Sequence, residues 1–335
     1  MYYVCKYELH LNINYNVTIY STISIQNNER LHMITVNIMG GLGNQLFQIF
    51  ATIATALRNN DTFFFMRYIR LPGNPGHIRK TQWDTLFKSL DPYITNVNDI
   101  TNAAFQKLPI WKETSFEYNE LPTSTRQLDK PLRLYGYFQS EKYFVSKYTE
   151  ICEMIQLNAN QELIKNECSR EEWSREIRGN NPVEKTRQLI SMHFRIGDSV
   201  LNPHIHPILD IVYYKNALNY MISILNASTP LSILVFYEEC DQNTVYKNVA
   251  ILQREFSTYN IKFYFIDVKI EDWKQLLMMS ICDHNIIANS TFSWWGAYFN
   301  ANTQKVVCYP NIWFGPGVSY NTKDLCPDSW IKITA

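Results

Sequence analysis

The sequence predicts an α/β protein with two α/β halves, the second of them a doubly wound parallel sheet. The chain has 335 residues, 46% hydrophobic and 19% charged, which is enough apolar material for one large or two medium cores. Strand-like and helix-like segments alternate along the second half, as parallel strands joined by crossover helices require. In the first half, a glycine-rich loop joins a predicted strand to a predicted helix.

The first half begins with a segment that lacks a clear pattern. Residues 1–32 are rich in Asn, Tyr and Thr, and we assign them to an N-terminal extension. Apolar and polar residues then alternate over Ile34–Ile38 as in a strand, and apolar residues recur at helical spacing over Leu46–Leu57. A second strand is expected at Thr62–Met66. This unit opens an N-terminal α/β domain that we predict at residues 33–180.

The end of this domain is predicted from charge and turn residues. A strand at Leu132–Phe138 and a helix at Glu141–Ile155 are followed by Asn158–Asn181, which is charged and turn-rich. We place the domain boundary in that segment. Residues 181–335 then form a C-terminal Rossmann-like domain.

The second half is organised as strands that alternate with helices. In such sheets, ligands bind at the carboxyl ends of the strands, so the residues that follow each strand are candidates for function. The expected strands are Leu189–Arg195, Leu231–Tyr237, Ile261–Ile266, His284–Asn289 and Lys305–Tyr309, and the expected helices lie near 211–225, 242–256, 271–281 and 292–300.

Charge and cysteine usage exclude several classes of protein. The 31 Lys and Arg residues balance the 31 Asp and Glu residues, so no net field attracts nucleic acid or an anionic membrane. No apolar run approaches the roughly 18 residues that span a bilayer, so we expect no stable membrane insertion. The seven cysteines are scattered without a C-x-x-C pair, which argues against a zinc ribbon and suits a cytoplasmic protein.

The glycine loop Gly40–Gln45 is the first candidate binding element. Glycines between a strand and a helix N-terminus let backbone amides approach an anion or a sugar ring. Leu46 stands where a dinucleotide site has its third glycine, and the G-K-[ST] ending of a phosphate-binding loop is absent. Nicotinamide and ATP sites are therefore disfavoured, while a tight turn without a ligand stays open.

The second candidate element follows the strand at Leu189–Arg195. Strand alternation places His193 and Arg195 on one face and Phe194 and Ile196 on the other. A guanidinium at the end of a strand suits a pyrophosphate, because its fork can hold two oxygens of a departing diphosphate. Asp198 could orient Arg195, and a simple ion pair between these two residues is the structural alternative.

The third candidate element is the segment Ala288–Ala297, which leaves a predicted strand and enters the helix expected near 292–300. Its hydroxyl-rich start can cap the helix or bind phosphate oxygens, and Trp294 and Trp295 are expected in the core. Together, the three elements suggest a nucleotide diphosphate held between two α/β halves. The metal-binding D-x-D pattern is absent, Glu239–Asp241 being the nearest run, and His204 and His206 lack a third zinc ligand. We therefore expect no metal.

Four sequence blocks resemble the α-1,2-fucosyltransferases of glycosyltransferase family 11. They are Gly40–Gln48, Gly136–Phe144, His193–Asp198 and Asn289–Ala297, and Pro310–Phe314 is similar to the closing motif of the family. The resemblance implies a GT-B-like fold with two facing Rossmann-like domains, the N-terminal one on the acceptor side and the C-terminal one on the GDP-fucose side. It also implies GDP-β-L-fucose as donor, no required metal or other cofactor, and inversion to an α-1,2-linked fucose on a glycan acceptor.

Position by position, the resemblance also assigns candidate residues. Arg195 matches an arginine expected to hold the β-phosphate, and Asn44 matches an asparagine near the donor fucose. Ile196 replaces the second arginine of the family, and Glu238 and Glu239 stand where the family often has Ser-Asp-Asp. The catalytic candidates are Arg195, His193, Asp198 and Asn44, and the donor-binding candidates are Gly41, Gly43, Asn44, His193, Arg195, Asn289, Ser290, Thr291, Phe292 and Ser293.

The predicted function is inverting, metal-independent transfer of L-fucose to the 2-hydroxyl of galactose or a similar sugar. The departures at Ile196 and Glu238 also allow a catalytically impaired GDP-sugar or glycan binding protein, which is the strongest rival. An NAD(P)-dependent oxidoreductase with two Rossmann-like lobes and a protein O-fucosyltransferase are weaker rivals.

Overall fold

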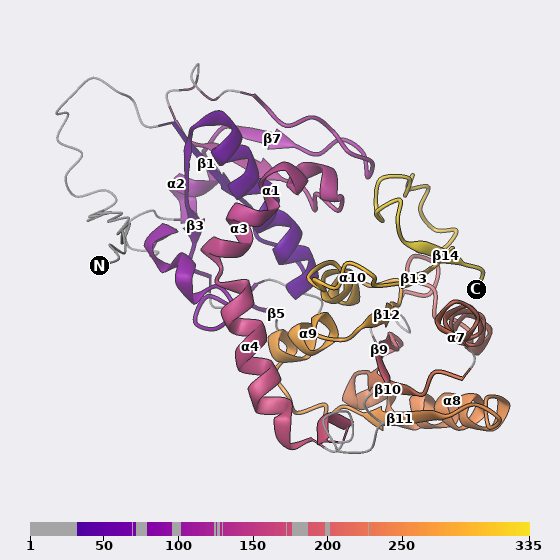
Figure 1. Cartoon of the computed structure of the whole chain (residues 1–335). Helices are drawn as coiled ribbons and strands as arrows, with labels where there is room; N and C mark the ends of the chain where they lie inside the picture. The colour runs from indigo at the N-terminus through magenta and orange to yellow at the C-terminus, as the bar shows by residue number, and fades with distance from the viewer. Residues whose placement is uncertain are drawn as a thin grey trace, which may run out of the picture.

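The computed structural model shows two α/β domains that face each other across a shared core (Figure 1). The predicted N-terminal extension lies outside the described residues except for His32, and the predicted boundary at residues 180–181 also lies outside them. The structure describes residues 32–68, 70–71, 79–95, 102–123, 125, 128, 130–171, 173–175, 187–197, 202–226 and 228–335.

The N-terminal domain is built on a four-stranded parallel sheet in the order β2-β1-β8-β7. Ile34 in the centre pairs with Phe63 on one side and Leu132 on the other. The carboxyl ends of β1 and β8 are therefore neighbours, which brings the loops that follow them together. The strands are β1 Met33–Val36, β2 Thr62–Phe63, β7 Ile110–Lys112 and β8 Leu132–Tyr135.

The strand predicted at Thr62–Met66 is divided between two sheets, and this part of the prediction is wrong. Phe63 and Phe65 pack into the main core, whereas Phe64 and Met66 pack with Phe105 in a separate small cluster. The chain leaves the main sheet after Phe63 and pairs with a different strand from Phe65 on. The additional pairs are β3 Phe65–Met66 with β6 Ile94–Thr95, which is parallel, and β4 Arg70–Leu71 with β5 Arg79–Lys80, which is antiparallel.

Helix α1, Leu42–Asn59, follows the glycine loop as predicted and ends at Asn60 in a left-handed conformation. Asparagine tolerates this conformation better than most residues, so it can end a helix there. The helix is buried along most of its length because it lies between the N-terminal sheet and α10, Thr291–Tyr298, of the other domain.

The C-terminal domain is a six-stranded parallel sheet in the order β11-β10-β9-β12-β13-β14. Numbered by appearance, this order is 3-2-1-4-5-6, that of the dinucleotide-binding Rossmann fold. The predicted doubly wound parallel sheet is confirmed, and β14 is an additional strand. The strands are β9 Gln188–His193, β10 Leu231–Phe236, β11 Ile261–Phe265, β12 His284–Ile286, β13 Val307–Pro310 and β14 Ile331–Ile333.

The helices of the C-terminal domain agree with the prediction within two residues at each end. Asp210 caps the first of them, because its side chain accepts a hydrogen bond from the amide of Val212. The helices are α7 Ile211–Leu225, α8 Gln242–Glu255, α9 Asp272–Ser280 and α10 Thr291–Tyr298.

The segment between the two sheets differs from the prediction. The helix expected over Glu141–Ile155 begins as 3-10 turns, and the expected turn-rich linker contains helix α4, Leu157–Glu167. The buried residues of α4 form one stripe along the helix and are Leu157, Gln161 and Ile164. Gln161 Nε2 donates to Ser280 Oγ and to the carbonyl of Phe299, so α4 packs on the C-terminal domain (Figure 1). Further helices in the described residues are α2 Asn102–Gln106, α3 Tyr148–Met154, η1 Lys88–Tyr93, η2 Glu141–Tyr143, η3 Val145–Lys147, η4 Cys168–Arg170 and η6 Glu239–Asp241.

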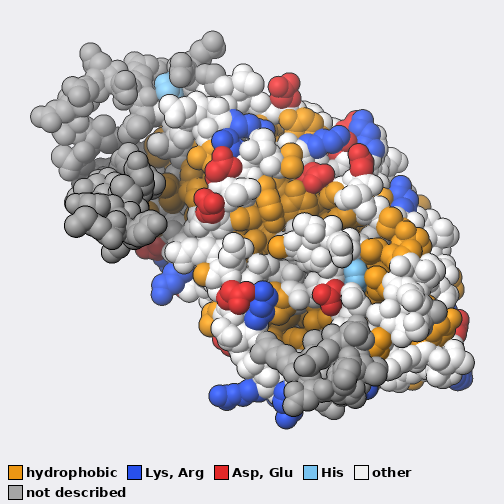
Figure 2. Space-filling model, viewed as in Figure 1, with side chains coloured by type: hydrophobic (Ala, Val, Ile, Leu, Met, Phe, Trp, Pro, Cys, Tyr) orange, Lys and Arg blue, Asp and Glu red, His pale blue; other side chains and the backbone are white. Residues whose placement is uncertain are grey.

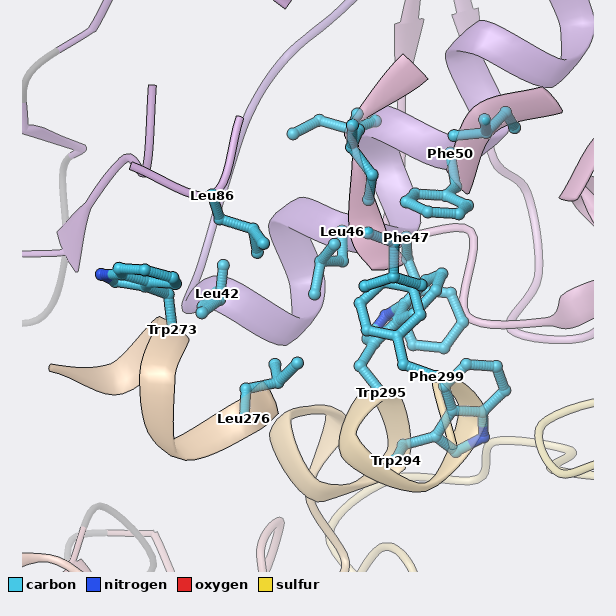
Figure 3. Packing of buried hydrophobic residues seen from close by; sticks show 14 of the residues in the cluster. Leu42, Leu46, Phe47, Phe50, Leu86, Trp273, Leu276, Trp294, Trp295 and Phe299 are labelled. Atoms are coloured by element: carbon cyan, nitrogen blue, oxygen red, sulfur yellow. The ribbon is translucent and has the colours of Figure 1, made fainter. Parts of the chain in front are cut away.

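An aromatic cluster joins the two domains. The ring of Phe47 on α1 lies 4.5 Å from that of Trp294, and the ring of Phe50 lies 4.6 Å from that of Trp295. Figure 3 shows these α1 side chains facing the tryptophans of α10. Both tryptophans are fully buried, which confirms the prediction that they belong to the core. One hydrophobic core therefore runs through both domains.

The surface carries charges of both signs. On the face shown in Figure 2, basic and acidic side chains are interspersed among apolar and polar ones. In the described part of the chain, no helix is long and apolar enough to cross a membrane.

Candidate functional site

A cleft of about 720 Å³ lies where the carboxyl ends of the two sheets face each other. It is lined by loops that follow β1 and β8 in one domain and β9, β10 and β12 in the other. In the C-terminal sheet, β9 and β12 are neighbours on either side of the point where strand order reverses, which is where such sheets bind nucleotides. Most of the predicted site residues line it: Gly41, Gly43, Asn44, His193, Arg195, Asn289, Ser290, Thr291 and Phe292.

The glycine loop is held in place by two glutamines of α1. Gln48 Oε1 accepts a hydrogen bond from the amide of Met39 at 2.8 Å, and Gln45 Nε2 donates to the carbonyls of Gly40 and Lys80. Gly40 has φ +75°, a conformation that favours glycine. The loop therefore has a fixed shape at the edge of the cleft.

The two glycines of the loop that are predicted to bind the donor, Gly41 and Gly43, differ in their surroundings. A Cβ atom built on Gly43 would lie 2.3 Å from the carbonyl carbon of Thr291, whereas one built on Gly41 meets nothing within 4 Å. Gly43 thus allows α1 to touch the start of α10 directly. The structure gives Gly43 a packing function between the domains, and Gly41 is the glycine whose open side lies in the cleft.

Asn44 joins the two domains by hydrogen bonds inside the cleft. Its Oδ1 atom accepts from Gln139 Nε2 and from Thr291 Oγ1, both at 2.9 Å. Gln139 follows β8 and is buried, and its Oε1 atom has no hydrogen-bond partner among the described residues. The sequence block Gly136–Phe144 contains Gln139, but only the β1–β8 pairing shows that it lies beside Asn44.

His193 ends β9 and packs against the start of α10. Its ring centroid lies 5.7 Å from that of Phe292, and its carbonyl accepts a hydrogen bond from the hydroxyl of Tyr214. Burial and the neighbouring positive charge of Arg195 lower the pKa of His193 to about 3, so its imidazole is neutral at physiological pH. A neutral imidazole here can exchange hydrogen bonds but accepts a proton poorly.

The strand alternation predicted for β9 is confirmed. Phe194 and Ile196 pack into the C-terminal core with Met192, while His193 and Arg195 line the cleft. Ile196 therefore stands on the face away from the cleft. The backbone amides of Ile196 and Gly197 donate to Asp241 Oδ2, at 3.2 and 2.9 Å.

Asp198, a predicted catalytic residue, lies outside the described residues. The ion pair between Asp198 and Arg195 therefore remains a sequence-based prediction. In the described part of this loop, Asp241 is the carboxylate that holds the backbone.

The start of α10 combines capping with exposure of its positive end. Ser290 Oγ accepts from the amide of Phe292, Thr291 Oγ1 donates to Asn44, and Ser293 Oγ donates to the carbonyl of Ser290. Ser290 therefore caps the helix, and Ser293 is buried. Because the dipole of α10 points its positive end at the cleft, its N-terminus favours an anion there.

Asn289 fixes the loops that surround the start of α10. Its Nδ2 atom donates to the carbonyl of Pro207 at 2.8 Å and to that of Trp313 at 3.4 Å. The residue is buried, and its Oδ1 atom has no hydrogen-bond partner among the described residues. Asn289 thus ties together the segments that follow β9, β12 and β13.

Several residues that line the cleft were not among the predicted site residues. They include carboxylates on the C-terminal side, of which Glu238 touches Gly197, since a Cβ there would lie 2.3 Å from Glu238 Oε2. The signal for Glu238 was its place after β10, whereas the others depend on long-range packing. The unpredicted lining residues include Arg79, Tyr137, Gln139, His206, Asp272 and Phe314.

Two facing Rossmann-like domains with a shared cleft define a GT-B-like protein, as predicted. The sequence profile of glycosyl transferase family 11 matches residues 2–333, and the chain belongs to this family of glycosyltransferases. The resemblance found in the sequence blocks is therefore confirmed.

Two relatives in Escherichia coli match this chain over almost their whole length. The chain is 28% identical over 325 residues to the O-antigen biosynthesis glycosyltransferase WbnK of Escherichia coli, which covers 88% of this chain and 99% of that protein. It is 26% identical over 315 residues to an alpha-1,2-colitosyltransferase of Escherichia coli, which covers 90% and 99%. Among solved structures, an Arabidopsis thaliana FUT1 variant in complex with GDP has a TM-score of 0.49 at 9% identity, covering 84% of this chain and 70% of that one.

Proposed function

We propose that this glycosyltransferase moves L-fucose from GDP-β-L-fucose to the 2-hydroxyl of a galactose or similar sugar, with inversion and without a metal. The observation that supports it most strongly is the convergence of Arg195, the N-terminus of α10 and the glycine loop on one cleft. Arg195 and the start of α10, both from the C-terminal domain, offer positive charge and amide dipoles to a diphosphate, and the glycine loop of the N-terminal domain faces them across the cleft.

In the proposed reaction, the acceptor oxygen attacks the anomeric carbon from the face opposite GDP. The bond between that carbon and the β-phosphate oxygen breaks, and its electron pair leaves with GDP. Arg195 and the amides at the start of α10 stabilise the charge that builds on the diphosphate. Because the pKa of His193 is lowered to about 3, its imidazole is a weak base. The carboxylates that line the cleft, such as Glu238, Glu239 and Asp272, are therefore the candidates to accept the proton.

Metal independence is proposed from the chemistry of the donor side. A guanidinium and a helix N-terminus neutralise a diphosphate without a divalent cation. The atoms of Glu238, Cys240 and Asp241 come within 4.8 Å of one another, but Asp241 already accepts two backbone amides. Asp241 therefore has a structural task in the loop after β9.

The donor sugar is proposed as fucose, with colitose as the comparison. The name of one relative says that it transfers colitose, which is the 3-deoxy form of fucose. Both sugars lack the 6-hydroxyl, so the two donors differ by one hydroxyl. The test therefore includes both GDP-sugars.

The deciding experiment is an assay in EDTA with GDP-fucose and GDP-colitose. Galactose-terminated, N-acetylglucosamine-terminated and rhamnose-containing acceptors are supplied, and NMR identifies the linkage formed. We expect an α-1,2-linked fucose on a galactose-type acceptor. A requirement for a divalent ion or another linkage would contradict the proposal. Tight GDP binding without transfer to any acceptor would instead support a catalytically impaired binding protein.

A further inference from the structure

We infer that the cleft continues into a second sugar subsite, an aromatic rim that binds the acceptor residue next to the one that receives fucose. The rim consists of Phe116, Tyr137, His206, Phe314 and Tyr320. The inference rests on the proposed function, because it takes the cleft to hold a glycan acceptor. It adds that the acceptor is an oligosaccharide.

The rim is continuous with the cleft. Tyr137, His206 and Phe314 line the cleft itself, together with Arg195 and Asn44. Phe314 contacts His206 with ring centroids 6.0 Å apart and Tyr320 with centroids 5.0 Å apart. A chain that enters the cleft from this side therefore passes over aromatic side chains.

Both domains contribute to the rim. Phe116, in the loop after β7, stacks on Tyr320 at 5.3 Å and meets Phe314 edge-to-face at 5.0 Å. Figure 1 shows this loop reaching toward the yellow C-terminal segment. The rim thus forms only where the two domains meet, as the cleft does.

Backbone contacts give the rim a fixed shape. The amide of Gly315 donates to the carbonyl of Ile205, and that of Gly317 donates to the carbonyl of His204. A Cβ on Gly315 would lie 2.4 Å from the His204 oxygen, so glycine is needed for this approach. These contacts hold Phe314 and His206 side by side, which spares a ligand the cost of ordering them.

Polar contacts across the domains support the outer part of the rim. Asn321 Nδ2 donates to Glu117 Oε2 at 2.8 Å, and the amide of Tyr118 donates to Asp324 Oδ2 at 3.0 Å. Each of these residues lies within four positions of Phe116 or Tyr320. The two rings are therefore anchored on both sides of the domain interface.

The exposure and chemistry of the rim suit a sugar ring. Tyr320 is 51% exposed and Tyr137 is 42% exposed, although large aromatic rings are usually buried. Burial and the neighbouring Tyr135 and Tyr320 raise the pKa of Tyr137, so its hydroxyl stays a hydrogen-bond donor. Aromatic faces pack against the apolar face of a pyranose, while hydroxyl and imidazole edges bond to its hydroxyls. An aliphatic patch would offer no such edges.

The test compares binding of matched mono- and disaccharides to the GDP-loaded full chain by calorimetry. The pairs carry galactose, N-acetylglucosamine or rhamnose at the terminal position. For the accepted sugar, we expect the disaccharide to bind about tenfold more tightly than the monosaccharide, a difference of about 1.4 kcal/mol. Tyr320→Ala should abolish this advantage, and Tyr320→Phe should keep it.

Tyr259→Ala is the matched control, because Tyr259 is 37% exposed but lies before β11, at the opposite edge of the sheet. It should keep the full advantage. The GDP affinity of Tyr320→Ala should equal that of the unsubstituted protein, and its melting temperature should stay well above the temperature of the assay, since unfolding would abolish GDP binding as well.

The inference fails if no disaccharide binds more tightly than its monosaccharide, or if Tyr320→Ala keeps the advantage. A serine- or threonine-containing peptide that binds the rim in preference to every disaccharide would also overturn it. Because binding is measured rather than turnover, absence of fucosyl transfer would count against the proposed function and not against the subsite.

Discussion

The two sides of the cleft use their polar groups differently. On the N-terminal side, the side chains of Gln45, Gln48 and Asn44 form hydrogen bonds with other groups of the protein. Gly43 allows α1 to pack closely against Thr291. On the C-terminal side, Arg195 and the positive end of α10 line the cleft, and His193 Nδ1 has no hydrogen-bond partner among the described residues. The first side builds a rigid wall, and the second presents charge and dipoles to a ligand.

This difference separates residues that shape the cleft from residues that act in it. Substitutions on the N-terminal side should lower stability first, because they break contacts within the protein. Substitution of Arg195 on the C-terminal side should lower turnover while the fold persists. The following predictions test this division, from the largest expected effect to the smallest.

Arg195→Ala should lower turnover by two or more orders of magnitude. Loss of one such contact to a developing anion costs about 3 to 4 kcal/mol in the transition state. The fold should remain intact, because Arg195 lies at the cleft rather than in the core. GDP release from GDP-fucose measures the rate, and circular dichroism measures the melting temperature.

The control for Arg195→Ala is Arg254→Ala, which removes an exposed arginine of α8. That variant should keep its turnover. Near-normal transfer by Arg195→Ala would refute the role assigned to this arginine.

Gly43→Ala should lower the free energy of unfolding by about 3 kcal/mol, because its Cβ would overlap backbone atoms of Thr291 and Phe292. Gly41→Ala, two positions away, should change it by less than about 0.5 kcal/mol, since that Cβ meets open space. Urea denaturation measures both. Equal effects of the two substitutions would show that α1 does not need this close approach to α10.

The stability of the protein should fall in acid partly because of His193. Its pKa in the folded protein is about 3, below the ordinary value of 6.5. Between these values the unfolded chain binds a proton that the folded protein excludes, so stability is lost as pH falls through this window. From pH 7.5 to pH 5 the loss should be about 2 kcal/mol.

His193→Gln tests this expectation, because glutamine cannot be protonated. The variant should lose about 2 kcal/mol less than the unsubstituted protein between pH 7.5 and pH 5, as measured by urea denaturation. An identical loss in both proteins would mean that His193 does not contribute to the acid sensitivity.

Thr291→Val should have the smallest effect, about 1 kcal/mol of stability, because it removes one hydrogen bond to Asn44 Oδ1. Thr291→Ser keeps a hydroxyl and should restore most of the loss. Thr258→Val, at an exposed position, serves as the control. If Thr291→Val is as stable as the unsubstituted protein, the bond between α10 and the glycine loop does not contribute measurably to stability.

The sequence predicted the C-terminal domain well because its signals are local. Strands such as Leu231–Phe236, which is apolar except for Ser232, stand between helical segments, and their order then follows from topology. The same topology predicted that Arg195 and the start of α10 would meet. The helix α4 was missed because Asn158 and Asn160 were interpreted as turn residues, although its buried stripe is helical.

The rest of the site depends on contacts between distant segments. Gln139 reaches Asn44 only because β8 pairs with β1, and Phe116 meets Phe314 only because the domains face each other. No local pattern contains that information. Conversely, the packing task of Gly43 could not be separated from ligand binding until its neighbour at Thr291 was known.

The aromatic cluster of α1 and α10 sets how the enzyme can move. Domains joined by small polar interfaces commonly swing about a hinge to admit ligands. Here, a wide swing would pull Phe47 away from Trp294 and Phe50 away from Trp295, exposing fully buried rings to water. Substrates should therefore enter through the mouth of a pre-shaped groove, and heating should melt both domains in a single cooperative transition.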